Sequence, residues 1–110
     1  MSYLNYQRAI KRTIPADMER KDRLAMFCMG LSGEQGEVVD HVKKHLFQGH
    51  TLDVEQIKDE AGDVLWYFTN LLSEVGLTIE EVQEHNIDKL YARYPNGFEA
   101  ERSVNRGQEK

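Results

Sequence analysis

The stretch GLSGEQGEVVDHVKK, residues 30–44, has the polarity pattern of a helix, yet it contains three glycines and two glutamates three residues apart, Glu34 and Glu37. Glycine weakens a helix interior, and like charges at neighbouring helical positions repel each other. A later segment, KDEAGDVLWYF at residues 58–68, repeats the acidic spacing with Glu60 and Asp63. The arrangement of these four carboxylates therefore decides both the fold and the chemistry.

The chain around these segments is predicted to be helical throughout. Asp53 is a suitable N-cap, and Thr78 with Glu81 matches a capping box. Strand-like alternation is absent, so the predicted class is all-α, and a four-helix bundle with two long central helices is the simplest architecture. The four predicted helices cover residues 3–13, 22–48, 53–75 and 78–94.

The two long helices each have an apolar stripe with an acidic flank. On a helical wheel both acidic pairs are offset from the stripe in the same direction, so antiparallel packing of the stripes would bring the acids together at the rim of the core. The stripe of the helix over 22–48 contains Leu24, Leu31, Val38 and Val42. The stripe of the helix over 53–75 contains Ile57, Ala61, Val64, Phe68 and Leu72.

The helix over 22–48 is expected to be roughly 40 Å long at 1.5 Å per residue. Two short helices cannot cover two long ones, and the segment LWYF, residues 65–68, spreads apolar surface around the third helix. We therefore expect a homo-oligomer, a homodimer or homotetramer, in which another subunit covers the remainder. The alternative is that the second helix kinks at its glycines and folds back.

Composition excludes several functional classes. The 110 residues are 40% hydrophobic and 30% charged, with a net charge of −5, which disfavours a nucleic acid polymer or an anionic membrane as partner. The apolar run LAMFCMGL, residues 24–31, is too short to span a bilayer, and the N-terminus lacks the apolar region of a secretion signal. The single cysteine, Cys28, is expected to be a buried thiol, and the expected compartment is the cytoplasm.

Four carboxylates at one rim need compensation, either by a divalent cation or by lysines and arginines. Oxygen ligands favour hard metals, and Mg²⁺ is the usual one where phosphates complete the shell. A di-iron bundle is excluded because no glutamate is followed three residues later by histidine. Asn86, Lys89 and Arg93 share one face of the fourth helix, where they would either hold phosphate oxygens or form a solvated, ion-paired surface.

The pair GEQGEVVDHVKK and DEAGDVLWYF, followed by NIDKLYARYPNGF, resembles the signature of MazG-like nucleotide pyrophosphohydrolases in the all-α NTP pyrophosphatase superfamily. The resemblance extends from YQRAIKRT, residues 6–13, to RYPNGF, residues 93–98. It implies a catalytic domain over residues 1–98, and the polar sequence over 99–110 predicts a tail that is loose, without regular structure, unless a partner subunit holds it. It also implies Mg²⁺-dependent hydrolysis of an NTP or dNTP to the monophosphate and pyrophosphate, with Mn²⁺ as a possible substitute and nucleotide-pool house-cleaning as a role.

The resemblance also assigns residues to roles. It implies that the metal ligands and catalytic acids are Glu34, Glu37, Glu60 and Asp63. It implies that the substrate contacts are Lys44, Tyr67, Asn86, Lys89 and Arg93. The competing hypothesis is a non-enzymatic helical module, for nucleotide sensing or protein interaction, whose acids are ion-paired to Lys43, Lys44, Lys58, Lys89 and Arg93.

Overall fold

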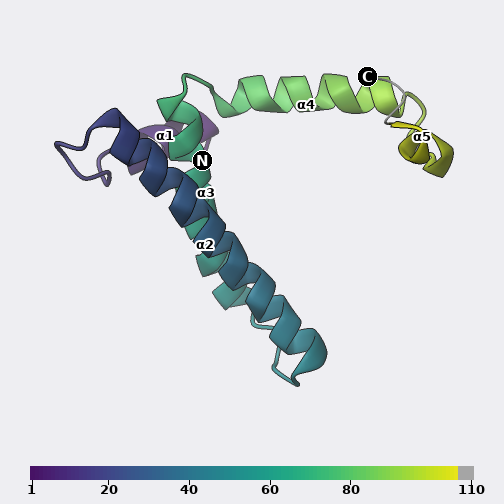
Figure 1. Cartoon of the computed structure of the whole chain (residues 1–110), viewed down its shortest axis with the longest axis horizontal. Helices are drawn as coiled ribbons and strands as arrows, with labels where there is room; N and C mark the ends of the chain where they lie inside the picture. The colour runs from purple at the N-terminus through teal and green to yellow at the C-terminus, as the bar shows by residue number, and fades with distance from the viewer. Residues whose placement is uncertain (107–110) are drawn as a thin grey trace. The chain divides into compact units, whose positions relative to one another are not determined.

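The computed structural model describes residues 1–106, which form helices and no strand (Figure 1). The predicted all-α class is thus confirmed. The described residues group into two compact units, Met1–Gly76 and the chain from Leu77 on. The helices are α1 (Tyr3–Lys11), α2 (Arg20–Phe47), α3 (Val54–Glu74), α4 (Ile79–Arg93) and α5 (Ala100–Val104).

Local sequence signals set the helix ends. The Asp53 side chain accepts a hydrogen bond from a first-turn backbone N–H at 3.2 Å, as an N-cap does. Thr78 and Glu81 form the predicted capping box, with both reciprocal bonds at 3.1 Å. Gly49 and Gly76 follow α2 and α3 with φ of 72° and 81°, a conformation that glycine adopts without steric cost. Helices α2, α3 and α4 therefore begin and end within two residues of the prediction.

Helix α2 is a single helix of 28 residues, so the alternative in which it kinks and folds back is excluded. It lies alongside α3 and runs antiparallel to it (Figure 1). Helix α1 also packs on α3. The first unit is thus a long helical pair with a short helix against one end.

The apolar core of this unit lies at the end where α1 packs. Phe27 is 1% exposed, and Ile10 and Leu72 are also buried. The Trp66 ring meets Phe27 edge-on, with centroids 5.8 Å apart, and its Nε1 donates to Thr13 Oγ1 at 2.8 Å. Edge-to-face aromatic packing of this kind adds stability beyond the area buried. This end therefore anchors the helical pair.

The predicted apolar stripes are buried only in part within the single chain. Ala61 and Phe68 of α3 and Val42 of α2 are exposed, whereas the acidic Glu60 is 9% exposed. Glu60 is the most buried of the four acids, whereas Asp63 on the same flank of α3 is exposed. Cys28, expected to be buried, is exposed.

The second unit consists of α4 and the chain after it. The Arg102 guanidinium of α5 donates to the backbone carbonyls of Ala92 and Arg93. These carbonyls lie at the end of α4, where a helix provides no N–H partner of its own. The prediction of a tail without regular structure is wrong for Ala100–Val104, which form α5. Residues 107–110 of that predicted tail lie outside the described residues. No helix in the described part of the chain is both long and apolar enough to cross a bilayer.

Candidate active site

The four acids of the two motifs occupy facing stretches of α2 and α3. Burial raises the pKa of the Glu34 carboxyl, and the neighbouring Glu37 raises it further. The charges of Asp63 and Glu60, on the opposite helix, raise the same pKa. These charge effects place Glu34 near the two acids of the opposite helix, and α2 and α3 pack against each other.

Two of these carboxylates keep an oxygen without a protein partner. Glu34 Oε2 and Glu60 Oε2 are both buried, and neither forms a hydrogen bond. The other oxygen of Glu60, Oε1, accepts a hydrogen bond from Gln56 Nε2 at 3.2 Å. A buried acceptor that lacks a donor destabilises the fold unless a ligand satisfies it.

A divalent cation fits this donor set, because carboxylate oxygens are hard ligands. Among residues 1–106, no group of three acidic, histidine or cysteine side chains is placed so that it could hold a metal ion. The unpaired oxygens and the mutual repulsion at Glu34 are nevertheless what a cation would relieve.

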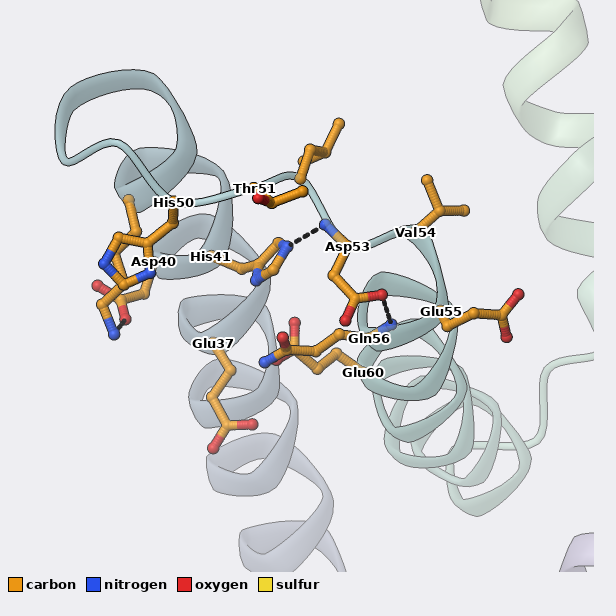
Figure 2. A pocket seen from close by; sticks show the side chains of 12 residues that line it. Glu37, Asp40, His41, His50, Thr51, Asp53, Val54, Glu55, Gln56 and Glu60 are labelled. Atoms are coloured by element: carbon orange, nitrogen blue, oxygen red, sulfur yellow. Dashed lines mark hydrogen bonds and ion pairs between the residues drawn. The ribbon is translucent and has the colours of Figure 1, made fainter.

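Glu37 and Glu60 line a cavity of about 600 Å³ near the turn between α2 and α3. Figure 2 shows Gln56 and Glu60 extending from α3 into the space between the helices, with Glu37 on α2. Lys44 lines the same cavity, as does His41, whose Nε2 accepts a hydrogen bond from a backbone N–H at the start of α3 (Figure 2). The cavity thus has acidic groups on both helices, with Lys44 and His41 beside the acids of α2.

Glu34 and Asp63 line a second cavity, of about 350 Å³, together with Trp66 and Tyr67. The Tyr67 ring lies against Gly30, where an added Cβ would be 2.1 Å from a ring carbon. Any larger residue at that position would displace the ring. Tyr67, predicted to contact substrate, is therefore held beside two of the acids.

The glycines of the first acidic motif have open space around them within this chain. A Cβ added at Gly33 or Gly36 would meet nothing within 4 Å, in contrast to Gly30. The rotation of α3 about its axis decides which glycine faces the Tyr67 ring, and helical periodicity does not determine that rotation.

The lysines near the site are paired with other acids. Lys44 Nζ lies 2.9 Å from an Asp40 oxygen and Lys43 Nζ lies 3.2 Å from the other, and these contacts hold the Asp40 pKa below its usual value. Lys58 pairs with Glu55 at 2.7 Å. Within Met1–Gly76, none of the four motif acids takes part in an ion pair. The interaction-module hypothesis therefore lacks the ion pairs it expects from Lys43, Lys44 and Lys58.

The remaining predicted substrate contacts lie on α4, in the second unit. Asn86 and Lys89 are exposed and Arg93 is half-buried. Their spacing of three and four residues places them on one face of α4. They form a polar and basic face, as predicted, and their role as phosphate ligands remains a prediction.

Tyr6 and Gln56 lie near the acids, and the sequence alone does not assign either of them to the acidic site. Burial raises the pKa of Tyr6 on α1, and the charge of Asp63 raises it further, so this phenol lies near the acids. Gln56 holds one oxygen of Glu60. No spacing rule links α1 to α3, so the proximity of Tyr6 to Asp63 could not be read from the sequence. Gln56 stands four residues before Glu60, which is a recognisable helical contact.

Comparison with known proteins agrees with these observations. A family model, the MazG nucleotide pyrophosphohydrolase domain, matches residues 25–98, which include all four acids. The chain belongs to the MazG nucleotide pyrophosphohydrolase family. A relative, the Gene 37 protein of Mycobacterium phage L5, is 32% identical over 85 residues, which cover 74% of this chain and 75% of the relative. No solved structure matches the chain. Membership confirms the resemblance and points to nucleotide pyrophosphohydrolysis as the general class of activity.

Proposed function

We propose that this MazG-family chain hydrolyses nucleoside triphosphates, ribo or deoxy, to a nucleoside monophosphate and pyrophosphate with Mg²⁺. The observation that supports this most strongly is the pair of buried carboxylate oxygens of Glu34 and Glu60 that lack a partner, together with the Glu34 pKa, which burial and the charges of Glu37, Asp63 and Glu60 raise. Such a set of oxygens suits a cation that also binds phosphate. We further propose that the enzyme acts in the cytoplasm and removes unwanted nucleotides from the pool.

The four acids would hold Mg²⁺, and Mn²⁺ would substitute for it because it accepts similar oxygen ligands. A bound divalent cation would neutralise phosphate charge and polarise the phosphorus–oxygen bonds. Gln56 holds Glu60 Oε1 and leaves Oε2 free, so this glutamate is already oriented for a ligand. We assign Gln56 a positioning role.

The reaction would begin with a water molecule attacking the α-phosphorus opposite the leaving pyrophosphate. A bond forms between the water oxygen and phosphorus, and the bond from phosphorus to the α,β-bridging oxygen breaks. One water proton passes to a carboxylate. Glu37 is our choice for this base, because it is exposed and lines the larger cavity.

The basic and polar side chains would hold the triphosphate. Lys44 lines the cavity that contains Glu37 and is a candidate phosphate contact, shared with Asp40. Asn86, Lys89 and Arg93 on α4 would bind further phosphate oxygens, since arginine and lysine provide charge-assisted hydrogen bonds. Tyr67 would contact the nucleotide from its position beside Gly30.

The catalytic unit is proposed to be a homo-oligomer, a dimer or tetramer, built from the domain over residues 1–98. Large apolar side chains remain exposed along the helical pair, as expected if another copy covers them. Those exposed on α2 are Met29, Val39, Val42, Leu46 and Phe47, and those exposed on α3 are Val54 and Phe68.

The test is to incubate the chain with a panel of NTPs and dNTPs and Mg²⁺, and to assay monophosphate and pyrophosphate. We expect equal amounts of both products from at least one nucleotide, and loss of at least about 100-fold of the rate in Glu60→Gln. In parallel, Mg²⁺ or Mn²⁺ should raise the melting temperature of the wild-type chain but not of Glu60→Gln. Release of inorganic phosphate, or no product from any nucleotide, would refute the proposal.

A further inference from the structure

A third cavity, of about 430 Å³, lies at the α1 end of the helical pair, away from the acids. Its lining comes from α1, the loop after it, α2 and α3. The residues that matter below are Gln7, Ile14, Pro15, Phe27 and Asn70. This cavity is independent of the motif acids, none of which lines it.

Asn70 is the unusual member of this lining. Its side chain is 3% exposed, yet the amide nitrogen Nδ2 has no hydrogen-bond partner. A buried unpaired amide costs about 1–3 kcal/mol, so a partner that enters the cavity would gain that free energy. The unpaired group is a donor, which requires an acceptor atom on the ligand.

Most other polar side chains of the cavity are paired. Gln7 Nε2 donates to the Ser73 hydroxyl, and Arg23 pairs with Glu74. Lys11 also lines the cavity and is exposed. Within the described residues, Asn70 is the side chain of this lining that is buried and has an amide N–H without a partner.

The rest of the wall is apolar. Ile14, Pro15 and the buried ring of Phe27 provide flat, nonpolar surfaces beside the amide. Small-molecule sites commonly combine such walls with a few fixed polar groups. A nucleobase matches this chemistry, because it has apolar faces and acceptors on its edge.

The register of the helices relates this cavity to the acids. Asn70 stands seven residues after Asp63 on α3, and Phe27 stands seven residues before Glu34 on α2. Seven residues are two turns, so each pair shares a face of its helix at a separation of about 10 Å. Tyr67 and Trp66 lie between the two levels and also line the cavity of Glu34 and Asp63. A nucleotide lying along this seam would have its phosphates at the acids and its base near Asn70.

We infer that this cavity is the base-binding subsite and that Asn70 Nδ2 donates a hydrogen bond to an acceptor atom on the edge of the base. The inference rests on the proposed function, since the base belongs to the hydrolysed nucleotide. A carbonyl oxygen or a ring nitrogen can accept this bond, so every common base offers a partner to Asn70. A site with a buried donor discriminates against ligands that leave the donor unpaired.

The experiment uses nucleosides, which lack phosphate, in the presence of a chelator, so that neither metal nor hydrolysis contributes. Uridine, thymidine, cytidine, guanosine and adenosine are titrated into the wild-type chain by calorimetry and by NMR. We expect saturable binding of at least one nucleoside. The Asn70 side-chain amide resonance should shift on binding.

Asn70→Leu removes the amide at similar volume. Because the amide is already unpaired, the variant should unfold at the same or a higher denaturant concentration, and nucleoside binding should weaken at least about tenfold. Thr69→Val is the matched control, since Thr69 is 0% exposed with an unpaired hydroxyl but does not line the cavity, so binding should be unchanged.

The inference is overturned if no nucleoside binds, as when a second copy of the chain fills the cavity, or if Asn70→Leu binds like the wild type. An unshifted Asn70 amide resonance at saturation overturns it without any variant. Nucleoside binding without triphosphate hydrolysis would refute the proposed function alone. Hydrolysis without nucleoside binding would refute the base-binding subsite alone.

Discussion

The α1 end of the helical pair and the acidic region nearer the turn between α2 and α3 both contain unpaired buried atoms, but of different chemistry. At the α1 end, Arg23 pairs with Glu74 and Trp66 donates to Thr13, while the neutral side chains of Thr69 and Asn70 each keep a buried atom without a partner. In the acidic region the atoms without a partner are carboxylate oxygens of Glu34 and Glu60. The α1 end thus combines the aromatic core with neutral unpaired groups, whereas the acidic region has unpaired oxygens that suit a cation.

The largest effect is expected from removing the aromatic anchor of the α1 end, the ring of Phe27 that packs against Trp66. Phe27→Ala should lower the free energy of unfolding by about 3–5 kcal/mol, because it deletes a buried ring and leaves a cavity. That loss is a large part of the stability of a small domain. Denaturant unfolding monitored by circular dichroism measures it.

Phe27→Leu provides the graded control for this anchor, since it keeps most of the apolar volume and should cost clearly less. If Phe27→Ala unfolds at the wild-type denaturant concentration, the α1 end does not stabilise the pair. The comparison between the two ends would then be wrong.

The next largest effect is expected where the two ends meet, at the contact between Gly30 and Tyr67. An added Cβ at Gly30 would lie 2.1 Å from the ring, so Gly30→Ala should cost about 1–3 kcal/mol through overpacking. Gly33→Ala is a matched control on the same helix, because its Cβ would meet nothing within 4 Å. It should gain up to about 1 kcal/mol of helix propensity. Equal shifts in the two denaturant midpoints would show that the ring does not depend on Gly30.

The sequence predicts those parts of the molecule that depend on neighbours within one helix. Capping residues such as Asp53 and Thr78 form local hydrogen bonds, so they mark helix ends correctly. The spacing of Glu34 with Glu37 on α2, and of the matching pair on α3, correctly predicts that the acids approach one another. The fit of Tyr67 against Gly30 and the burial of Glu60 depend on how α3 is rotated against α2, which no local pattern specifies.

The short helix α5 was missed for a similar reason. Its five residues are too few to form a stable helix alone, and Arg102 instead binds the carbonyl end of α4. The cavity at Asn70 was also missed as a site, because burial without a partner is a tertiary property. Such features become visible only when separate helices are packed together.

A smaller effect on stability is expected at Glu34, where a substitution distinguishes charge repulsion among the acids from a stabilising structural contact. Glu34→Gln removes one charge from a group whose pKa is raised by burial and by its acidic neighbours, so without metal the melting temperature should rise. The same variant should lose the stabilisation by Mg²⁺ that the wild-type chain gains. Thermal melts with EDTA and with Mg²⁺ measure both changes. A drop in the melting temperature in EDTA would indicate that Glu34 has a structural partner.

The smallest effect is expected for a charge that is already paired at the surface. Asp40 accepts from Lys44 and Lys43 at 2.9 and 3.2 Å, and all three side chains are solvent-accessible. Exposed pairs of this kind contribute little, so Asp40→Asn should change the melting temperature by less than about 2 °C at pH 7. Because the Asp40 pKa is lowered in the folded chain, the pair stabilises above the unfolded pKa, and that contribution is lost as the pH falls through the folded value. Melts of both proteins at pH 7 and at pH 2.5 should therefore differ slightly at the first pH and converge at the second. A large difference in melting temperature that persists at pH 2.5 would mean that Asp40 stabilises the α2–α3 turn by something other than its charge.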